Sequence, residues 1–155
     1  MIYLLPHKYK IYRKNGIYIV RGTEKLPCPH CGGKLHVHGT CQRKLREIDC
    51  IRKFRLRVMK CKSCGKTHRE LPSFFVPYKR YSLNSICEIL CSAKGLHPCD
   101  TSTRCRFLAH FFVLWPQKLE EKGETIRKKL RYAMADMKAL RRAIIKIIYL
   151  SIWKW

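Results

Sequence analysis

Acidic residues are scarce in this chain. It has 10 Asp and Glu against 34 Lys and Arg over 155 residues, which gives a formal net charge of +24 at neutral pH. The acids are scattered, and their one close group, Glu120, Glu121 and Glu124, lies where a helix is expected to begin and complements the helix dipole. Metal-dependent strand transfer needs clustered carboxylates to hold Mg²⁺. The sequence therefore predicts no such chemistry.

Other signatures are missing as well. There is no Gly-x-Ser-x-Gly motif, no phosphate-cradling glycine loop and no nucleophile–base pair, so we expect that the chain is not an enzyme. The opening segment 1–8 has no apolar run long enough for a signal peptide. The apolar run 143–155 is interrupted by Lys146 and Lys154 and is well short of the ~20 residues that span a bilayer. We predict a cytoplasmic protein without a membrane segment.

The excess of positive charge indicates the kind of partner. A net charge of +24 attracts polyanions, and nucleic acid is the commonest polyanion that a cytoplasmic protein meets. Charge alone does not separate DNA from RNA or from the ribosome. We predict a nucleic-acid partner, with DNA preferred over RNA.

Cysteine is abundant and patterned. Two Cys-x-x-Cys knuckles, Cys28-Pro-His-Cys31 and Cys61-Lys-Ser-Cys64, are separated by 29 residues, and glycine follows each of them. Each knuckle offers two thiolates on one tight turn, and two such turns together give four soft ligands in a tetrahedron, which suits Zn²⁺. The sequence predicts one structural zinc ion, the alternative being four buried or redox-paired thiols.

Two further cysteines, Cys87 and Cys91, are four residues apart and would face the same side of a helix. They are candidates for a second metal site together with His97 or Cys99. The simpler explanation is that they are buried thiols, because free cysteine is among the most buried residue types.

Two histidines adjoin the knuckles. His30 lies within the first knuckle and His68 follows the second. Because four thiolates complete a tetrahedral site, both histidines are predicted to lie outside the ligand set.

A hairpin is expected near the N-terminus. The β-prone runs 9–14 and 17–21 are separated by Asn15-Gly16, which favours a type I′ turn. This pairing would place Tyr12 opposite Ile19.

A basic strand is expected between the knuckles. In the run 51–60, Phe54 and Leu56 alternate with cations, and alternate side chains of a strand face opposite sides. We predict a surface that follows the phosphate backbone, although a merely solvated basic face has the same pattern. The predicted contacts are Arg43, Lys44, Arg46, Lys53, Arg55 and Arg57.

Helices are expected in the second half. After a hinge containing Leu71-Pro72 and Val76-Pro77, one helix is predicted from Ser82 to Gly95, and Asp100 or Ser102 caps another. Near the start of the second helix lie Thr103, Arg104 and Arg106, where the recognition helix of a helix-turn-helix presents its DNA-reading residues. A plain helical hairpin is the alternative.

The chain is thus predicted to have an α+β fold in four parts. These are an N-terminal β-hairpin (1–26), a small antiparallel zinc ribbon (27–70), a hinge with helix-turn-helix-like helices (71–115) and a long basic amphipathic C-terminal helix (116–155). The apolar stripe of the last helix would pack on the preceding helices or form a homodimer.

The order of several segments resembles a known family. Leu26–Gly33, Met59–His68, Glu70–Pro72 and Val76–Tyr81 follow one another as in uncharacterised bacterial proteins with a zinc ribbon and a helix-turn-helix. They are also similar to the N-terminal DNA-binding part of zinc-ribbon insertion-sequence transposases. The resemblance covers about residues 26–110.

That resemblance implies four zinc ligands, Cys28, Cys31, Cys61 and Cys64, and a recognition helix opened by residues 100–103. We therefore predict a zinc-dependent DNA-binding protein, associated with a mobile element or acting as a regulator. Two alternatives remain open: an RNA- or ribosome-binding protein, and a protein-interaction adaptor that works through its C-terminal helix.

Overall fold

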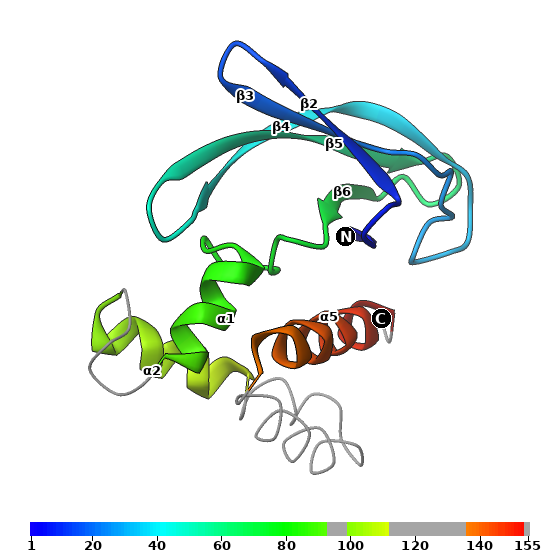
Figure 1. The fold of residues 1–155 in the computed structure, drawn as a ribbon. Helices are drawn as coiled ribbons and strands as arrows, with labels where there is room; N and C mark the ends of the chain where they lie inside the picture. Colours follow the sequence, from blue (N-terminus) through cyan, green and yellow to red (C-terminus); the bar gives the residue numbers. More distant parts are fainter. Residues whose placement is uncertain (93–98, 112–135, 154–155) are drawn as a thin grey trace. The chain divides into compact units, whose positions relative to one another are not determined.

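The strands and helices of the chain occupy different parts of it. A computed structural model describes residues 1–92, 99–111 and 136–153 (Figure 1). The chain divides into one compact unit over Met1–Ser82 and another that begins at Leu83. The strands are β1 (Ile2–Leu4), β2 (Tyr9–Lys14), β3 (Ile17–Gly22), β4 (Leu35–Arg46), β5 (Ile51–Cys61) and β6 (Thr67–Pro72). The helices are α1 (Leu83–Cys91), α2 (Thr101–Ala109) and α5 (Met137–Trp153).

Strand β5 is the centre of a single curved, six-stranded sheet (Figure 1). Along one edge it pairs with β4, antiparallel, over nearly its whole length. The other edge is shared: β3 pairs with residues 53–55 and β6 with residues 58–60. β2 extends the sheet beyond β3, and β1 extends it beyond β6. β5 therefore contacts three other strands and holds the two ends of the sheet together.

The predicted fold class is wrong in two respects, and the first concerns the sheet. The hairpin and the ribbon are one mixed sheet, since β3 runs parallel to β5 and β1 runs parallel to β6. Among the described residues the strands contain more of the chain than the helices do. The physical reason is burial: Ile2 and Leu4 of β1 and Val20 of β3 are buried in the mixed sheet, whereas a free N-terminal segment and an isolated hairpin would leave them in water.

The hairpin itself has the predicted turn and register. Asn15 and Gly16 have φ values of 49° and 72°, as a type I′ turn requires. Tyr12 pairs with Ile19, and Arg13 pairs with Tyr18. The local part of this prediction is therefore confirmed.

An aromatic cluster forms the core of the first unit. The ring of Phe54 stacks on Tyr18 and meets Phe75 edge-on, with both centroids 5.2 Å away. Phe75 and Val76 are fully buried, so the segment predicted as a hinge packs within this unit. It returns to the sheet beside β4, where Arg46 and Tyr81 form an isolated bridge.

Helix caps set the starts of two helices in the second unit. The Asp100 carboxylate accepts a hydrogen bond from the Thr103 N–H at 2.7 Å, so the predicted cap of α2 is confirmed. The Asp136 carboxylate accepts the N–H groups of Lys138 and Ala139 at 2.9 and 3.2 Å. α1 begins directly after Ser82, as predicted.

The second correction to the predicted fold class concerns the C-terminal helix, which begins after the cap at Asp136. The predicted single helix over residues 116–155 is wrong, because a helix starts at Met137 and has 17 residues. Leu140 and Ile144 are buried, as the predicted stripe requires, whereas its other positions lie outside the described side chains. Among the described residues, no helix has the length and apolar character needed to cross a membrane.

Candidate metal centre

The two cysteine knuckles adopt the same turn. In the first, the Gly32 N–H donates to the Cys28 carbonyl at 2.9 Å, and in the second the Gly65 N–H donates to the Cys61 carbonyl at 3.1 Å. Both glycines have a positive φ, 71° and 70°, which explains why glycine follows each second cysteine. The first knuckle connects β3 to β4, and the second connects β5 to β6.

The antiparallel pairing of β4 with β5 brings the knuckles together. Leu35, just after the first knuckle, pairs with Cys61, and the Lys62 N–H donates to the Lys34 carbonyl at 3.0 Å. The ligand atoms of the four cysteines all lie within 4.8 Å of one another. The cluster is thus built by strand register as well as by local turns. It consists of Cys28, Cys31, Cys61 and Cys64.

The sulfur spacing suits a tetrahedral metal ion. The Sγ atoms of Cys28 and Cys64 are 3.7 Å apart, and those of Cys31 and Cys61 are 3.5 Å apart. Four sulfurs about 2.3 Å from a zinc ion would be about 3.8 Å apart. None of these four cysteines takes part in a disulfide, so their thiols are available to a metal ion. The donor set and its spacing fit one metal ion.

The four thiols influence one another's protonation. Hydrogen bonds from the backbone of Cys64 and Ser63 lower the pKa of the Cys61 thiol to about 6, against the effect of burial. The backbone of Gly33 lowers the pKa of Cys31, but the neighbouring thiols outweigh it and raise that pKa to about 12. A divalent cation removes this competition, because its charge stabilises all four thiolates at once. Metal binding would therefore release protons.

His68 lies against the cluster without belonging to it. Its Nε2 is 3.3 Å from Cys28 Sγ, and its Nδ1 is 3.3 Å from the Met1 amino group. Burial and the nearby amino group lower the pKa of His68, which favours the neutral ring. The predicted place of His68 outside the ligand set agrees with these contacts. His30 is exposed and faces the Lys66 ammonium group.

Close contact between the knuckles predicts a requirement for glycine at position 33. A Cβ atom there would lie 2.5 Å from Ser63 Oγ and 3.1 Å from Cys61 Sγ. We expect Gly33→Ala to weaken metal binding and to lower stability by about 1–3 kcal/mol, because one knuckle must move. Gly39→Ala is the control, since a Cβ at Gly39 meets nothing within 4 Å. Competition with a chromophoric chelator measures the affinity, and equal affinities for both variants would contradict this account.

The other cysteine pair forms no comparable group. Burial raises the pKa of Cys87 to about 12, which is typical of an inert packed thiol. Among the described residues, the four knuckle cysteines are the one group of three or more ligands close enough to share an ion. His97, a suggested partner of Cys87 and Cys91, lies outside the described residues.

Three of the arginines predicted to contact DNA donate hydrogen bonds to backbone carbonyls of the chain. Arg43 donates to the carbonyls of Val76 and Lys79 at 3.4 and 2.7 Å. Arg104 donates to the carbonyls of Ile89 and Ser92 at 3.3 and 3.0 Å, so that it ties α2 to the end of α1. The third is Arg57, described below. These guanidinium groups position the chain's own backbone.

The remaining predicted contacts are more accessible. Lys44 and Lys53 are exposed and directly opposite each other on β4 and β5. Arg46 is exposed, and its guanidinium lies 5.5 Å from the centroid of the Tyr81 ring and donates to the Tyr81 hydroxyl at 3.2 Å. Arg55 lies two residues after Lys53 on β5, on the same face of the strand, and is partly exposed. Thr103 uses its hydroxyl to donate to Asp100 at 2.7 Å, and Arg106 is exposed.

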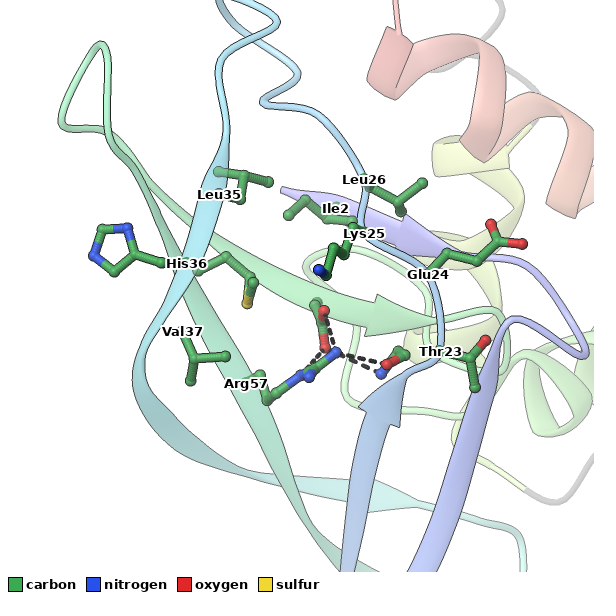
Figure 2. A pocket seen from close by; sticks show the side chains of 12 residues that line it. Ile2, Thr23, Glu24, Lys25, Leu26, Leu35, His36, Val37 and Arg57 are labelled. Carbon is green, nitrogen blue, oxygen red and sulfur yellow. Dashed lines mark hydrogen bonds and ion pairs between the residues drawn. The ribbon is translucent and has the colours of Figure 1, made fainter.

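Sequence reasoning missed the buried Glu70, which pairs with Arg57. The Arg57 Nε and Nη2 groups donate to the two carboxylate oxygens of Glu70 at 2.7 and 2.8 Å, and Nη2 also reaches the Gly22 carbonyl at 2.8 Å. Figure 2 shows these contacts in a pocket lined by Ile2, Leu35 and neighbouring side chains. Gly22, Arg57 and Glu70 come from β3, β5 and β6, so no local sequence pattern indicates that they interact.

Residues 28–107 match a family described as a domain of unknown function, DUF6431. The chain belongs to the DUF6431 family. The matched range begins at the first knuckle cysteine and ends within α2, so the DUF6431 region includes all four clustered cysteines. No curated protein and no solved structure matches the chain, and no named relative supports the resemblance to transposases.

Proposed function

We propose that this chain is a zinc-dependent DNA-binding protein that holds the phosphate backbone on one face of its sheet. The observation that carries the proposal is a row of cations across neighbouring strands. Lys14 pairs with Ile17, Ile17 with Lys53, and Lys53 with Lys44. Residues paired across strands share a face of the sheet, so the three ammonium groups face the same side. All three lysines are exposed.

This row of lysines destabilises the sheet when only water covers it. Like charges directly opposite each other destabilise a sheet, and the row contains no acidic residue that offsets them. Arg55, which pairs with Ile19, adds another cation to the same face in the next row. A polyanion relieves this repulsion, and the release of its counterions favours binding. We call the surface formed by Lys14, Lys44, Lys53 and Arg55 the basic face.

The metal has a structural role in this proposal. Four thiolates leave no ligand position open for a substrate, and soft sulfur ligands in a tetrahedron favour zinc. The ion would fix the ends of β4 and β5, the two strands that carry Lys44 and Lys53. A reducing compartment such as the cytoplasm keeps these thiols available. We propose a binding role without catalysis, and a homodimer through the C-terminal helix stays a prediction.

The basic face is tested by neutralising its lysines. We expect the triple variant Lys14→Gln, Lys44→Gln and Lys53→Gln to bind duplex DNA about 100-fold more weakly at 0.1 M salt. The slope of log affinity against log salt should fall by about 2.7, because three phosphate contacts are lost. The melting temperature should not decrease, since the change removes repulsion between like charges. Fluorescence anisotropy at several salt concentrations measures both quantities.

The control removes the same charge elsewhere in the first unit. Lys25, Lys34 and Lys62 are exposed and lie outside the strands. Their triple replacement by glutamine should leave the affinity within about 3-fold of the original, since distant charges are screened. Equal losses in both variants would mean that net charge alone drives binding. Competition by structured RNA that exceeds competition by duplex DNA would replace the proposal with the RNA-binding alternative.

A further inference from the structure

Tyr78 has an unusual backbone and an unusual exposure. Its φ is 62°, in the left-handed region, which is uncommon for an aromatic residue and costs about 1 kcal/mol or more. Its side chain is 85% exposed, against 50% for Tyr12, another exposed tyrosine in the first unit. A bulky apolar ring is therefore held in water on a strained backbone. Strain of this kind persists where the surrounding structure enforces it.

The surrounding structure does enforce this conformation. The Arg43 guanidinium donates to the Val76 and Lys79 carbonyls, on either side of Tyr78. The Lys79 N–H donates to the Val76 carbonyl at 3.1 Å and closes the turn. Arg43 itself lies 5.0 Å from the centroid of the buried Phe75 ring. Arg43 thus fixes the backbone of the loop from its buried side, while the Tyr78 side chain is exposed to solvent.

The neighbours of Tyr78 indicate what the ring meets. Lys79 and Arg80 follow it directly, and no acidic residue occurs from residue 71 to residue 87. The Arg46 N–H donates to the Arg80 carbonyl at 2.7 Å, which joins the loop to the end of β4, an edge strand that carries Lys44. Arg43, which holds the loop, and Lys44 are successive residues of β4, so the loop and the basic face lie on opposite sides of this edge. An exposed aromatic ring beside cations is the arrangement with which proteins stack on unpaired bases while they neutralise the phosphates.

We propose that Tyr78 stacks on an unpaired base of DNA that runs from the basic face around the β4 edge of the sheet. This inference rests on the proposed function and names its substrate class: single-stranded DNA, or a duplex with unpaired bases. The clamp by Arg43 fixes the loop before binding, so little ordering of the ring is needed when a base arrives. Arg43 then acts as a positioning residue for the tyrosine.

Binding to an oligothymidylate and to a fully paired duplex of the same length tests this inference. We expect Tyr78→Ala to weaken single-strand binding by about 5-fold to 100-fold and to change duplex binding little, because one base–aromatic stack is lost. Tyr78→Phe should keep the single-strand affinity, since the ring remains. A 5-iodouracil base in the oligothymidylate should crosslink to Tyr78 on irradiation, as peptide mapping would show.

Two further variants separate loss of stacking from loss of fold. Tyr78→Gly removes the ring and suits the left-handed backbone, so the melting temperature should not fall while the single-strand affinity does. Tyr12→Ala, which removes the less exposed tyrosine, should leave the ratio of single-strand to duplex affinity unchanged. If DNA binds and Tyr78→Ala changes both affinities equally or neither, the stacking role is wrong and the proposed function stands. If neither DNA form binds, the proposed function itself fails.

Discussion

Cys61→Ser is expected to release the metal ion and to unfold the first unit. Cys61 is 1% exposed at the end of β5, and its sulfur lies 3.5 Å from that of Cys31. A structural zinc site of four thiolates contributes on the order of 10 kcal/mol, which is more than the usual net stability of a small domain. Elemental analysis should find about one zinc ion per chain in the original protein and little in the variant.

A control and a second measurement make this result interpretable. Cys105→Ser replaces an exposed thiol in α2 and should change neither the zinc content nor the melting temperature. Because an unfolded Cys61→Ser chain is degraded in cells, the original protein is also treated with a strong chelator and then with zinc. Circular dichroism should show loss and recovery of the sheet. Protein purified without chelators that contains no metal would disprove the site.

The second large effect concerns the pair formed by Arg57 and Glu70. Their side chains are 22% and 5% exposed, so the removal of Arg57 leaves the Glu70 carboxylate buried without its cation. We expect Arg57→Met to destabilise the first unit by about 3 kcal/mol, the lower end of the range for buried pairs, because Arg57 keeps some contact with water. Urea denaturation measures this loss, and the slope of the free energy of unfolding against urea concentration should not change.

Two further variants test whether the loss of stability comes from the buried charge of Glu70. Lys8→Met breaks the pair with Glu24, whose side chains are 36% and 45% exposed, and should cost less than ~1 kcal/mol. The double variant Arg57→Met and Glu70→Leu should recover much of the stability, since no charge is left buried. It should also bind DNA as the original does if Arg57 serves the fold. A 10-fold loss of affinity in the folded double variant would return Arg57 to the set of phosphate contacts.

The features that were predictable from the sequence are local. The knuckles are short turns with glycine at the position that needs a positive φ, and the Asn15-Gly16 turn fixes the register of β2 and β3. The Asp100 cap acts on an N–H three residues away. In each case the interacting groups are within a few residues, so the residue types alone specify the geometry.

The features that were missed join distant segments. The parallel pairings of β1 with β6 and of β3 with β5 leave no periodic signal that differs from that of an antiparallel strand. For the same reason Arg43, Arg57 and Arg104 resembled free cations, although their partners lie elsewhere in the chain. The long C-terminal helix was overestimated because its apolar periodicity continued past Asp136, where a cap starts the helix.

The pairing of β1 with β6 has a consequence for protein synthesis. Ile2 and Leu4 are synthesised before the rest of the sheet, and their partners Glu70 and Pro72 follow only after the other strands have been made. At about 5–20 residues per second, β1 waits on the order of 10 seconds before it can pair. All three of its residues are apolar and buried in the finished sheet, so a nascent chain displays them throughout this interval. The cost of this topology is therefore paid during synthesis, because β1 stays exposed to unintended contacts until β6 exists.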